Sequence, residues 1–138
     1  MRVVLDTNVL LSGLISPHGI PALLIQEWID NRYTLVTHEL QFAEFREVSR
    51  RDKIKALVRP FEAGRLLNRI GALADKPVGL PPVQRSRDPR DDFLLALCEA
   101  GGVDRLVTGD KDDLLALRKH KRTIILSAAE FARELGLR

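Results

Sequence analysis

Four acidic residues lie where the sequence predicts the end of a strand or the start of a helix. They are Asp6 in VVLDTNVLLSG, Glu44 in LQFAEFREV, Asp92 in RDPRDDFLLALC and Asp110 in LVTGDKDDLL. Asp6 and Asp110 follow short apolar runs typical of parallel strands, whose carboxyl ends form the ligand-binding edge of an open α/β sheet. Carboxylates about 5 Å apart repel by roughly 3 kcal/mol at an effective dielectric constant near 20. Because a divalent cation relieves such repulsion and hard oxygen ligands favour Mg²⁺ or Mn²⁺, the pattern predicts a metal site.

Polar residues beside two of these acids fit the same interpretation. Asn8 follows Asp6 by two residues, and Thr108 precedes Asp110 by two residues. Each of these side chains could instead cap a helix, since Asp, Asn and Thr all accept hydrogen bonds from free helix amides. We expect Asn8 and Thr108 to hold the carboxylates in place by hydrogen bonding.

Two further acidic positions need a choice between neighbours. In DPRDD, Asp91 is the better candidate for capping the helix, so Asp92 in its first turn is chosen as the ligand. In TGDKDD, Asp112 is close enough to Asp110 to bind a water molecule held by the ion. Asp113 is expected to be in solvent.

Composition restricts the class of protein. The chain has 138 residues, of which 45% are hydrophobic and 30% charged, and this length predicts one compact domain over residues 1–138. No apolar run approaches the ~20 residues that span a bilayer, so we expect no membrane association. A single cysteine, Cys98, and an N-terminus without the features of a secretory signal favour the reducing cytoplasm.

Basic residues are concentrated between Arg46 and Arg69. This stretch could hold the phosphate backbone of RNA beside an acidic metal site, although a solvated helical face explains it equally well. The candidates for RNA contact are Arg46, Arg50, Arg51, Lys53 and Lys55. A second cluster, at 118–122, is expected to complement the C-terminus of a helix.

Strand and helix patterns alternate along the chain. Apolar runs predict strands at 2–5, 32–36, 106–108 and 123–126. Helical patterns cover 20–29, 60–73, 93–100 and 111–117, with one helix capped by Thr37 and running to about residue 50, and a closing helix capped by Ser127. The proline-rich stretch 76–89 predicts a loop. Strands separated by helices indicate an α/β fold with a mostly parallel sheet covered on both faces.

Taken together, these segments resemble the PIN domain family over nearly the whole chain. VVLDTNVLLSGL, LVTHELQFAEFREV, RDPRDDFLLALCEAGGVDRLVTGDKDDLLAL and the final strand and helix follow the family's order. The long block from DPRDD to TGDKDDLL is the most specific part. The most similar branch comprises bacterial toxin components of toxin–antitoxin systems, related to VapC-like ribonucleases. One departure is His38-Glu39 after Thr37, where family members often have a serine and a proline nearby.

The resemblance implies a three-layer α/β/α sandwich and a Mg²⁺- or Mn²⁺-dependent ribonuclease that hydrolyses RNA phosphodiester bonds. Carried over by position, the acidic quartet is Asp6, Glu44, Asp92 and Asp110, supported by Asn8 and Thr108. The resemblance also implies a homodimer and a cognate antitoxin protein as partners.

Two alternatives belong to other classes. A non-catalytic RNA- or partner-binding module would keep the fold with only a weak metal site, but the complete quartet favours catalysis. A phosphatase or a phosphoacceptor receiver also uses an aspartate after its first strand. The chain lacks the second aspartate two residues after Asp6 that a haloacid-dehalogenase-type phosphatase needs. It also lacks a receiver's N-terminal acidic pair and late lysine.

Overall fold

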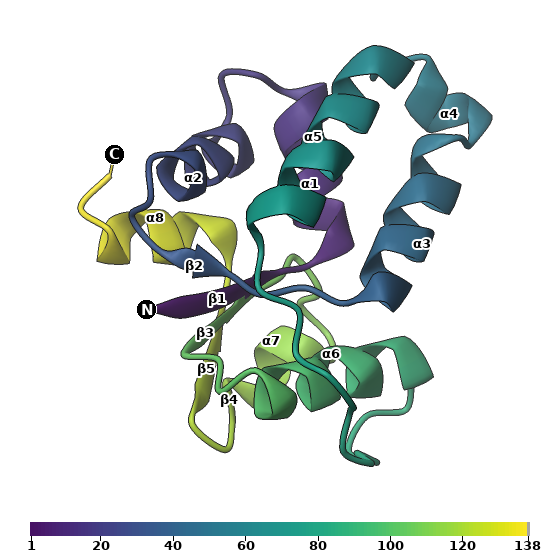
Figure 1. Cartoon of the computed structure of the whole chain (residues 1–138). Helices are drawn as coiled ribbons and strands as arrows, with labels where there is room; N and C mark the ends of the chain where they lie inside the picture. Colours follow the sequence, from purple (N-terminus) through teal and green to yellow (C-terminus); the bar gives the residue numbers. More distant parts are fainter. Residues whose placement is uncertain (138) are drawn as a thin grey trace.

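The computed structural model describes residues 1–137 and contains an α/β fold (Figure 1). Its elements, in chain order, are β1 (Arg2–Leu5), α1 (Thr7–Ile15), α2 (Ile20–Ile29), β2 (Thr34–Leu35), α3 (Glu39–Ser49), α4 (Asp52–Lys55), α5 (Pro60–Leu73), α6 (Pro89–Ala100), β3 (Arg105–Val107), α7 (Leu114–Leu117), β4 (Lys119–His120), β5 (Thr123–Leu126) and α8 (Ala128–Glu134). The predicted strands at 2–5 and 123–126 and the predicted helices at 20–29 and 60–73 are confirmed with the same bounds.

The strands form one mostly parallel sheet in the order β2-β1-β3-β5-β4. β1 pairs in parallel with β2 and β3, β3 pairs in parallel with β5, and only β4 runs antiparallel, against β5. The carboxyl ends of β1 and β3 therefore lie side by side at one edge. The predicted parallel sheet is confirmed. Because β1 and β3 are neighbours, the residues that follow these two strands meet at the carboxyl edge, where open α/β sheets bind ligands.

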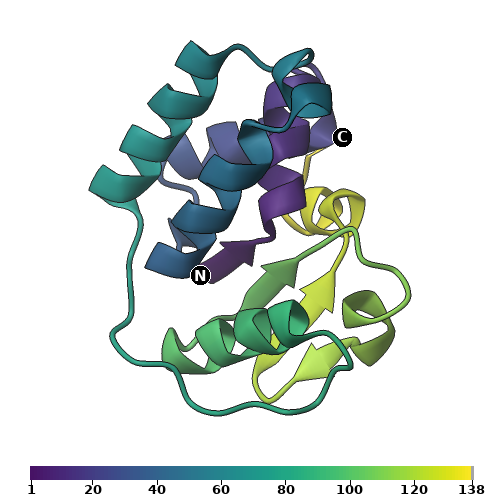
Figure 2. The ribbon, with the colours of Figure 1, turned by 90° about the vertical axis from the view of Figure 1, so that its right-hand side faces the viewer.

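Helices cover both faces of this sheet, which gives the predicted three layers (Figures 1 and 2). One face packs its inward side chains, such as Val4 and Leu106, against Leu97 of α6 and Leu114 of α7. The opposite face buries Val3, Leu5, Leu24 and Phe131 with helices α1, α2 and α8. β1 thus alternates its residues between two cores, as a strand covered on both faces must.

Some local expectations were wrong. The helix after Val36 is capped by His38, whose Nδ1 accepts a hydrogen bond from the Leu40 amide, whereas the Thr37 hydroxyl donates to Gln41 instead. The basic cluster at 118–122 does follow the C-terminus of a helix, since Arg118 is the C-cap of α7, and it continues through the β4–β5 hairpin, where Lys121 pairs with Glu99. Ser127 does cap α8, in a reciprocal capping box.

The first turn after β1 starts a helix that the sequence pattern did not reveal. α1 is mostly apolar, with Val9, Leu10 and Leu11 buried. Its polar stripe is limited to Asn8 and Ser12, which is too narrow for the segment to be recognised as an amphipathic helix. Within residues 1–137, no single helix is long and apolar enough to cross a membrane. α1 and α2 together have the length and composition, but they are bent by 104° at the break between them.

Candidate metal centre

The ends of β1 and β3 bring together residues that are 102 positions apart in sequence. The Asp6 amide donates to the Val107 carbonyl across the two strands, with an N···O distance of 2.9 Å. One residue further on, the Thr108 hydroxyl donates to Asp6 Oδ2 at 2.8 Å. The same hydroxyl oxygen accepts from the Asp110 amide at 3.1 Å. Thr108 is fully buried, so its hydroxyl links the two strand ends with little freedom to rotate away.

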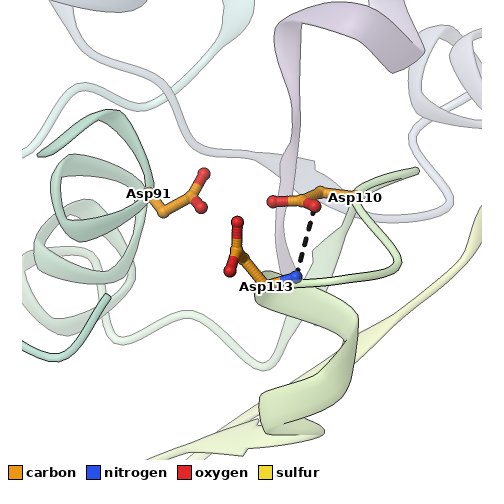
Figure 3. A group of neighbouring side chains, drawn as sticks. All are labelled: Asp91, Asp110 and Asp113. Carbon is orange, nitrogen blue, oxygen red and sulfur yellow. Dashed lines mark hydrogen bonds between the residues drawn. The ribbon is translucent and has the colours of Figure 1, made fainter. Parts of the chain in front are cut away.

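Three carboxylates converge beside this link. One oxygen from each of Asp91, Asp110 and Asp113 lies within 4.8 Å of the others. Asp91 comes from the first turn of α6, while Asp110 and Asp113 come from the loop that leads into α7, and the three side chains point toward one another (Figure 3). The Asp113 amide donates to Asp110 Oδ1 at 3.3 Å, which fixes this loop around the Asp110 carboxylate.

Burial and like charge leave this group electrostatically frustrated. Loss of hydration on burial, followed by the negative charge of Asp110, raises the pKa of Asp91 to about 6. Burial also raises the pKa of Asp6, and the charge of Glu44 adds to this effect, whereas the Thr108 hydroxyl opposes it. The site therefore favours a bound proton or a bound cation over empty, fully ionised carboxylates.

The structure brings Asp91, rather than the predicted Asp92, to the group. Asp92 Oδ1 accepts the backbone amides of Arg85 and Ser86 at 3.0 and 2.8 Å, so it fastens the preceding loop to α6. The helix is capped by Asp88, which accepts from the Arg90 amide, and the expectation that Asp91 does so was wrong. Successive helical residues point about 100° apart, so only one of the two can face the cleft.

The second neighbour choice also changes. Asp113, expected in solvent, is half-buried and belongs to the carboxylate group, whereas Asp112 is exposed and does not. Nothing in this geometry assigns Asp112 a role at the ion.

Asp6, Asn8 and Glu44 line the same cleft, which has a volume of about 560 Å³. Arg51 and Arg90 also line it, as do Asp88, Asp91, Asp110 and Asp113. Of the predicted RNA-binding residues, Arg51 is the one that reaches this wall, and it pairs with Glu47 at 3.0 Å. Arg90 was not singled out from the sequence, although its place directly before the acidic pair was a usable signal.

A family model described as PIN domain matches residues 2–112, which include every carboxylate of the cleft except Asp113. The chain belongs to the PIN domain family. PIN domains are generally metal-dependent nucleases, so the family agrees with the chemistry suggested by the cleft. No curated protein and no solved structure matched the chain.

The residues of this PIN domain fit a divalent cation. Asp91, Asp110 and Asp113 offer hard carboxylate oxygens, the donor type of Mg²⁺ and Mn²⁺ sites, without sulfur or imidazole donors in the group. Burial and the charge of Asp110 raise the pKa of Asp91, so keeping all three carboxylates ionised without a cation is unfavourable. A cation held by these oxygens would neutralise that excess negative charge.

We predict that stabilisation by Mn²⁺ will distinguish the aspartates that hold the ion from their sequence neighbours that do not. Millimolar Mn²⁺ should raise the Tm of the parent chain, because a ligand that binds the folded state stabilises it. Asp91→Asn and Asp113→Asn should lose most of this rise. Asp92→Asn should keep it, since an asparagine oxygen still accepts from Arg85 and Ser86, and so should Asp112→Asn. Thermal denaturation with and without Mn²⁺ tests this, and an equal Mn²⁺ response in Asp91→Asn and Asp92→Asn would contradict the assignment.

The raised pKa of Asp91 predicts a pH-dependent stability without metal. Its pKa in the folded chain, about 6, exceeds the ordinary aspartate value of 3.8, so the folded state holds the proton more tightly than the unfolded chain does. Stability is then lost as pH rises from about 4 through 6. Asp91→Asn should be more stable than the parent at pH 8, because the parent must keep a desolvated carboxylate ionised beside Asp110 there. The difference should shrink near pH 4. Urea denaturation in EDTA across this range measures it, and a constant difference would argue against it.

Proposed function

We propose that this PIN domain is a Mg²⁺- or Mn²⁺-dependent endoribonuclease that hydrolyses RNA phosphodiester bonds. The convergence of Asp91, Asp110 and Asp113 at the carboxyl edge of the sheet carries this proposal. The cleft around them is open to a polymer backbone, and Arg51 and Arg90 on its walls provide positive charge for phosphates. A nucleic-acid substrate accounts for both charge types in one cleft.

Residues at different places in the cleft would have different roles in hydrolysis. Asp91, Asp110 and Asp113 would hold the ion, and a bound divalent cation activates water and stabilises the charge that develops on the phosphate. Asp6, whose carboxylate is oriented by Thr108, lies across the cleft and would orient the attacking water and accept its proton. The raised pKa of Asp6 suits it to that acceptance better than an ordinary aspartate.

Glu44 and Asn8 would act on the same wall. Glu44 lies close enough to Asp6 to influence its pKa, so it could share the orientation of water or contact a second ion. Asn8 is exposed in the first turn of α1 and lines the cleft, so its amide could donate to a substrate oxygen.

The role of toxin in a toxin–antitoxin pair, together with a cognate antitoxin and a homodimer, is carried forward from the family resemblance. A short reading frame directly upstream that encodes a DNA-binding protein would support the toxin role. Its absence would favour a ribonuclease that acts without such a partner.

Replacing Asp6 should separate catalysis from folding. Asp6→Asn keeps a hydrogen-bond acceptor for Thr108 but removes the carboxylate charge, so cleavage of a mixed single-stranded RNA pool in Mn²⁺ should fall about 100-fold or more. Its Tm should match or exceed that of the parent. Asp110→Asn should lose activity likewise.

Asp92→Asn, which changes the same chemical group outside the cleft, serves as the matched control and should cleave like the parent. Full activity in a folded Asp6→Asn chain would exclude the proposed mechanism. Cleavage of DNA but not RNA would correct the substrate class.

The contribution of Arg51 is predicted from the salt dependence of RNA binding. Arg51 lines the cleft, whereas its neighbour Arg50 is exposed outside it. Arg51→Ala should weaken binding and reduce the slope of log K against log salt by about 0.7, the value for one phosphate contact on a single strand. Arg50→Ala should leave the slope unchanged. Binding would be measured by fluorescence anisotropy in Ca²⁺. Equal slopes for both variants would show that Arg51 makes no phosphate contact and is a solvated surface residue.

A further inference from the structure

Gln41 is a buried polar residue that the proposed mechanism does not use. It lies in the first turn of α3 and its side chain is 3% exposed. Its Nε2 donates to the Leu5 carbonyl and its Oε1 accepts from the Thr37 hydroxyl, both at 2.6 Å. A buried amide with both ends bonded is costly to disturb, because each lost partner leaves a desolvated polar group.

The position of the Leu5 carbonyl explains what this amide does. In the parallel pair of β1 and β2, the Thr34 amide donates to the Met1 carbonyl and the Val36 amide donates to the Val3 carbonyl. The next carbonyl in this series, two residues on, is that of Leu5. By then the second strand has ended and the chain has turned into α3. The Gln41 side chain takes the place of the missing backbone amide, and so adds one more rung to the ladder.

This added rung lies between the two acidic residues on one wall of the cleft. Leu5 directly precedes Asp6. On α3, Glu44 follows Gln41 by three residues, so these two side chains are neighbours on the same face of the helix. The bond from Gln41 to Leu5 thus fixes the start of α3 against the end of β1. It restrains the distance between the Asp6 and Glu44 carboxylates, which lie close enough for their charges to interact.

We propose that Gln41 is a positioning residue of the metal centre, which sets Asp6 and Glu44 on the cleft wall by extending the β1–β2 ladder with its side chain. The inference rests on the proposed function, since it assumes that the cleft holds a divalent ion. Gln41 touches neither substrate nor ion.

The test is Mn²⁺ binding to the metal-free full chain, measured by calorimetry. Gln41→Met keeps the length of the side chain but removes both hydrogen bonds. Asp6 is linked through the Thr108 hydroxyl to the amide of Asp110, one of the residues that would hold the ion, so a displaced Asp6 should lower Mn²⁺ affinity about tenfold, as when an outer partner of a ligand is lost. Thr37→Val is the matched control. It removes one bond of the same amide but leaves Gln41 bonded to Leu5, so it should lower the Tm while Mn²⁺ affinity stays at the parent value.

A double-mutant cycle tests whether Gln41 changes Mn²⁺ affinity through Asp6. If Gln41 acts through Asp6, then Gln41→Met should cause little further loss of Mn²⁺ affinity in an Asp6→Asn background, because coupled residues are not additive. Full additivity would overturn the inference. A parent chain that binds no Mn²⁺ would overturn the proposed function together with it. A parent that binds Mn²⁺ with the same affinity as folded Gln41→Met would overturn the positioning role alone.

A measurement on the unaltered chain keeps the inference testable even if Gln41→Met does not fold. The Gln41 side-chain amide protons should exchange with solvent far more slowly than those of the exposed Gln84, as followed by NMR in deuterated water. Equally fast exchange at Gln41 and Gln84 would show that the rung is not formed and would overturn the inference.

Discussion

The parallel pairing of β1 with β3 is the constraint on which the rest of the site depends. Its register sets Leu5 opposite Val107, so the next residues, Asp6 and Thr108, leave the sheet at the same level. A slip of one residue would turn the side chains of β3 to the opposite face of the sheet. Each apolar side chain of β3 would then point into the opposite core, and Thr108 would turn away from Asp6. The buried packing that holds the register therefore also holds the Thr108 hydroxyl between Asp6 and Asp110.

Packing also explains how mutually repelling carboxylates remain together. Asp91 is carried by α6, whose apolar residues Leu95 and Leu97 are fully buried against the sheet. Turning α6 to carry Asp91 away from Asp110 would pull these leucines out of the core, at a cost of about 1.5–3 kcal/mol each, which offsets a charge repulsion of a few kcal/mol. The fold thus tolerates local instability in the cleft, a common feature of functional sites in proteins that are only marginally stable overall.

The sequence predicted those parts of the fold that depend on local pattern. The strand at 2–5 and the helices at 20–29 and 60–73 were recognisable from apolar spacing, and strand ends correctly placed Asp6, Thr108 and Asp110 near one another. The choice between Asp91 and Asp92 could not be made locally. It depends on the rotation of α6 about its own axis, which is set by packing against the sheet. Asp113 was misplaced for a similar reason, because the loop after Asp110 folds back upon its carboxylate.

The two walls of the cleft come from opposite layers of the sandwich. α6 and the loop before α7 contribute Asp91, Asp110 and Asp113 from one layer. In the other, Asp6 follows β1 as the N-cap of α1, and Glu44 lies on α3. The two walls meet at the edge of the sheet, where the Thr108 hydroxyl donates to Asp6. Asp91, Asp110 and Asp113 would hold the cation from one wall and Asp6 would orient its water from the other, so the complete centre forms only when both layers are packed. Metal affinity and global folding are coupled in such an arrangement, because the complete ligand set does not exist in a partly unfolded chain. Loosening either core should therefore weaken the ion's binding, even where the substituted residue lies far from the carboxylates.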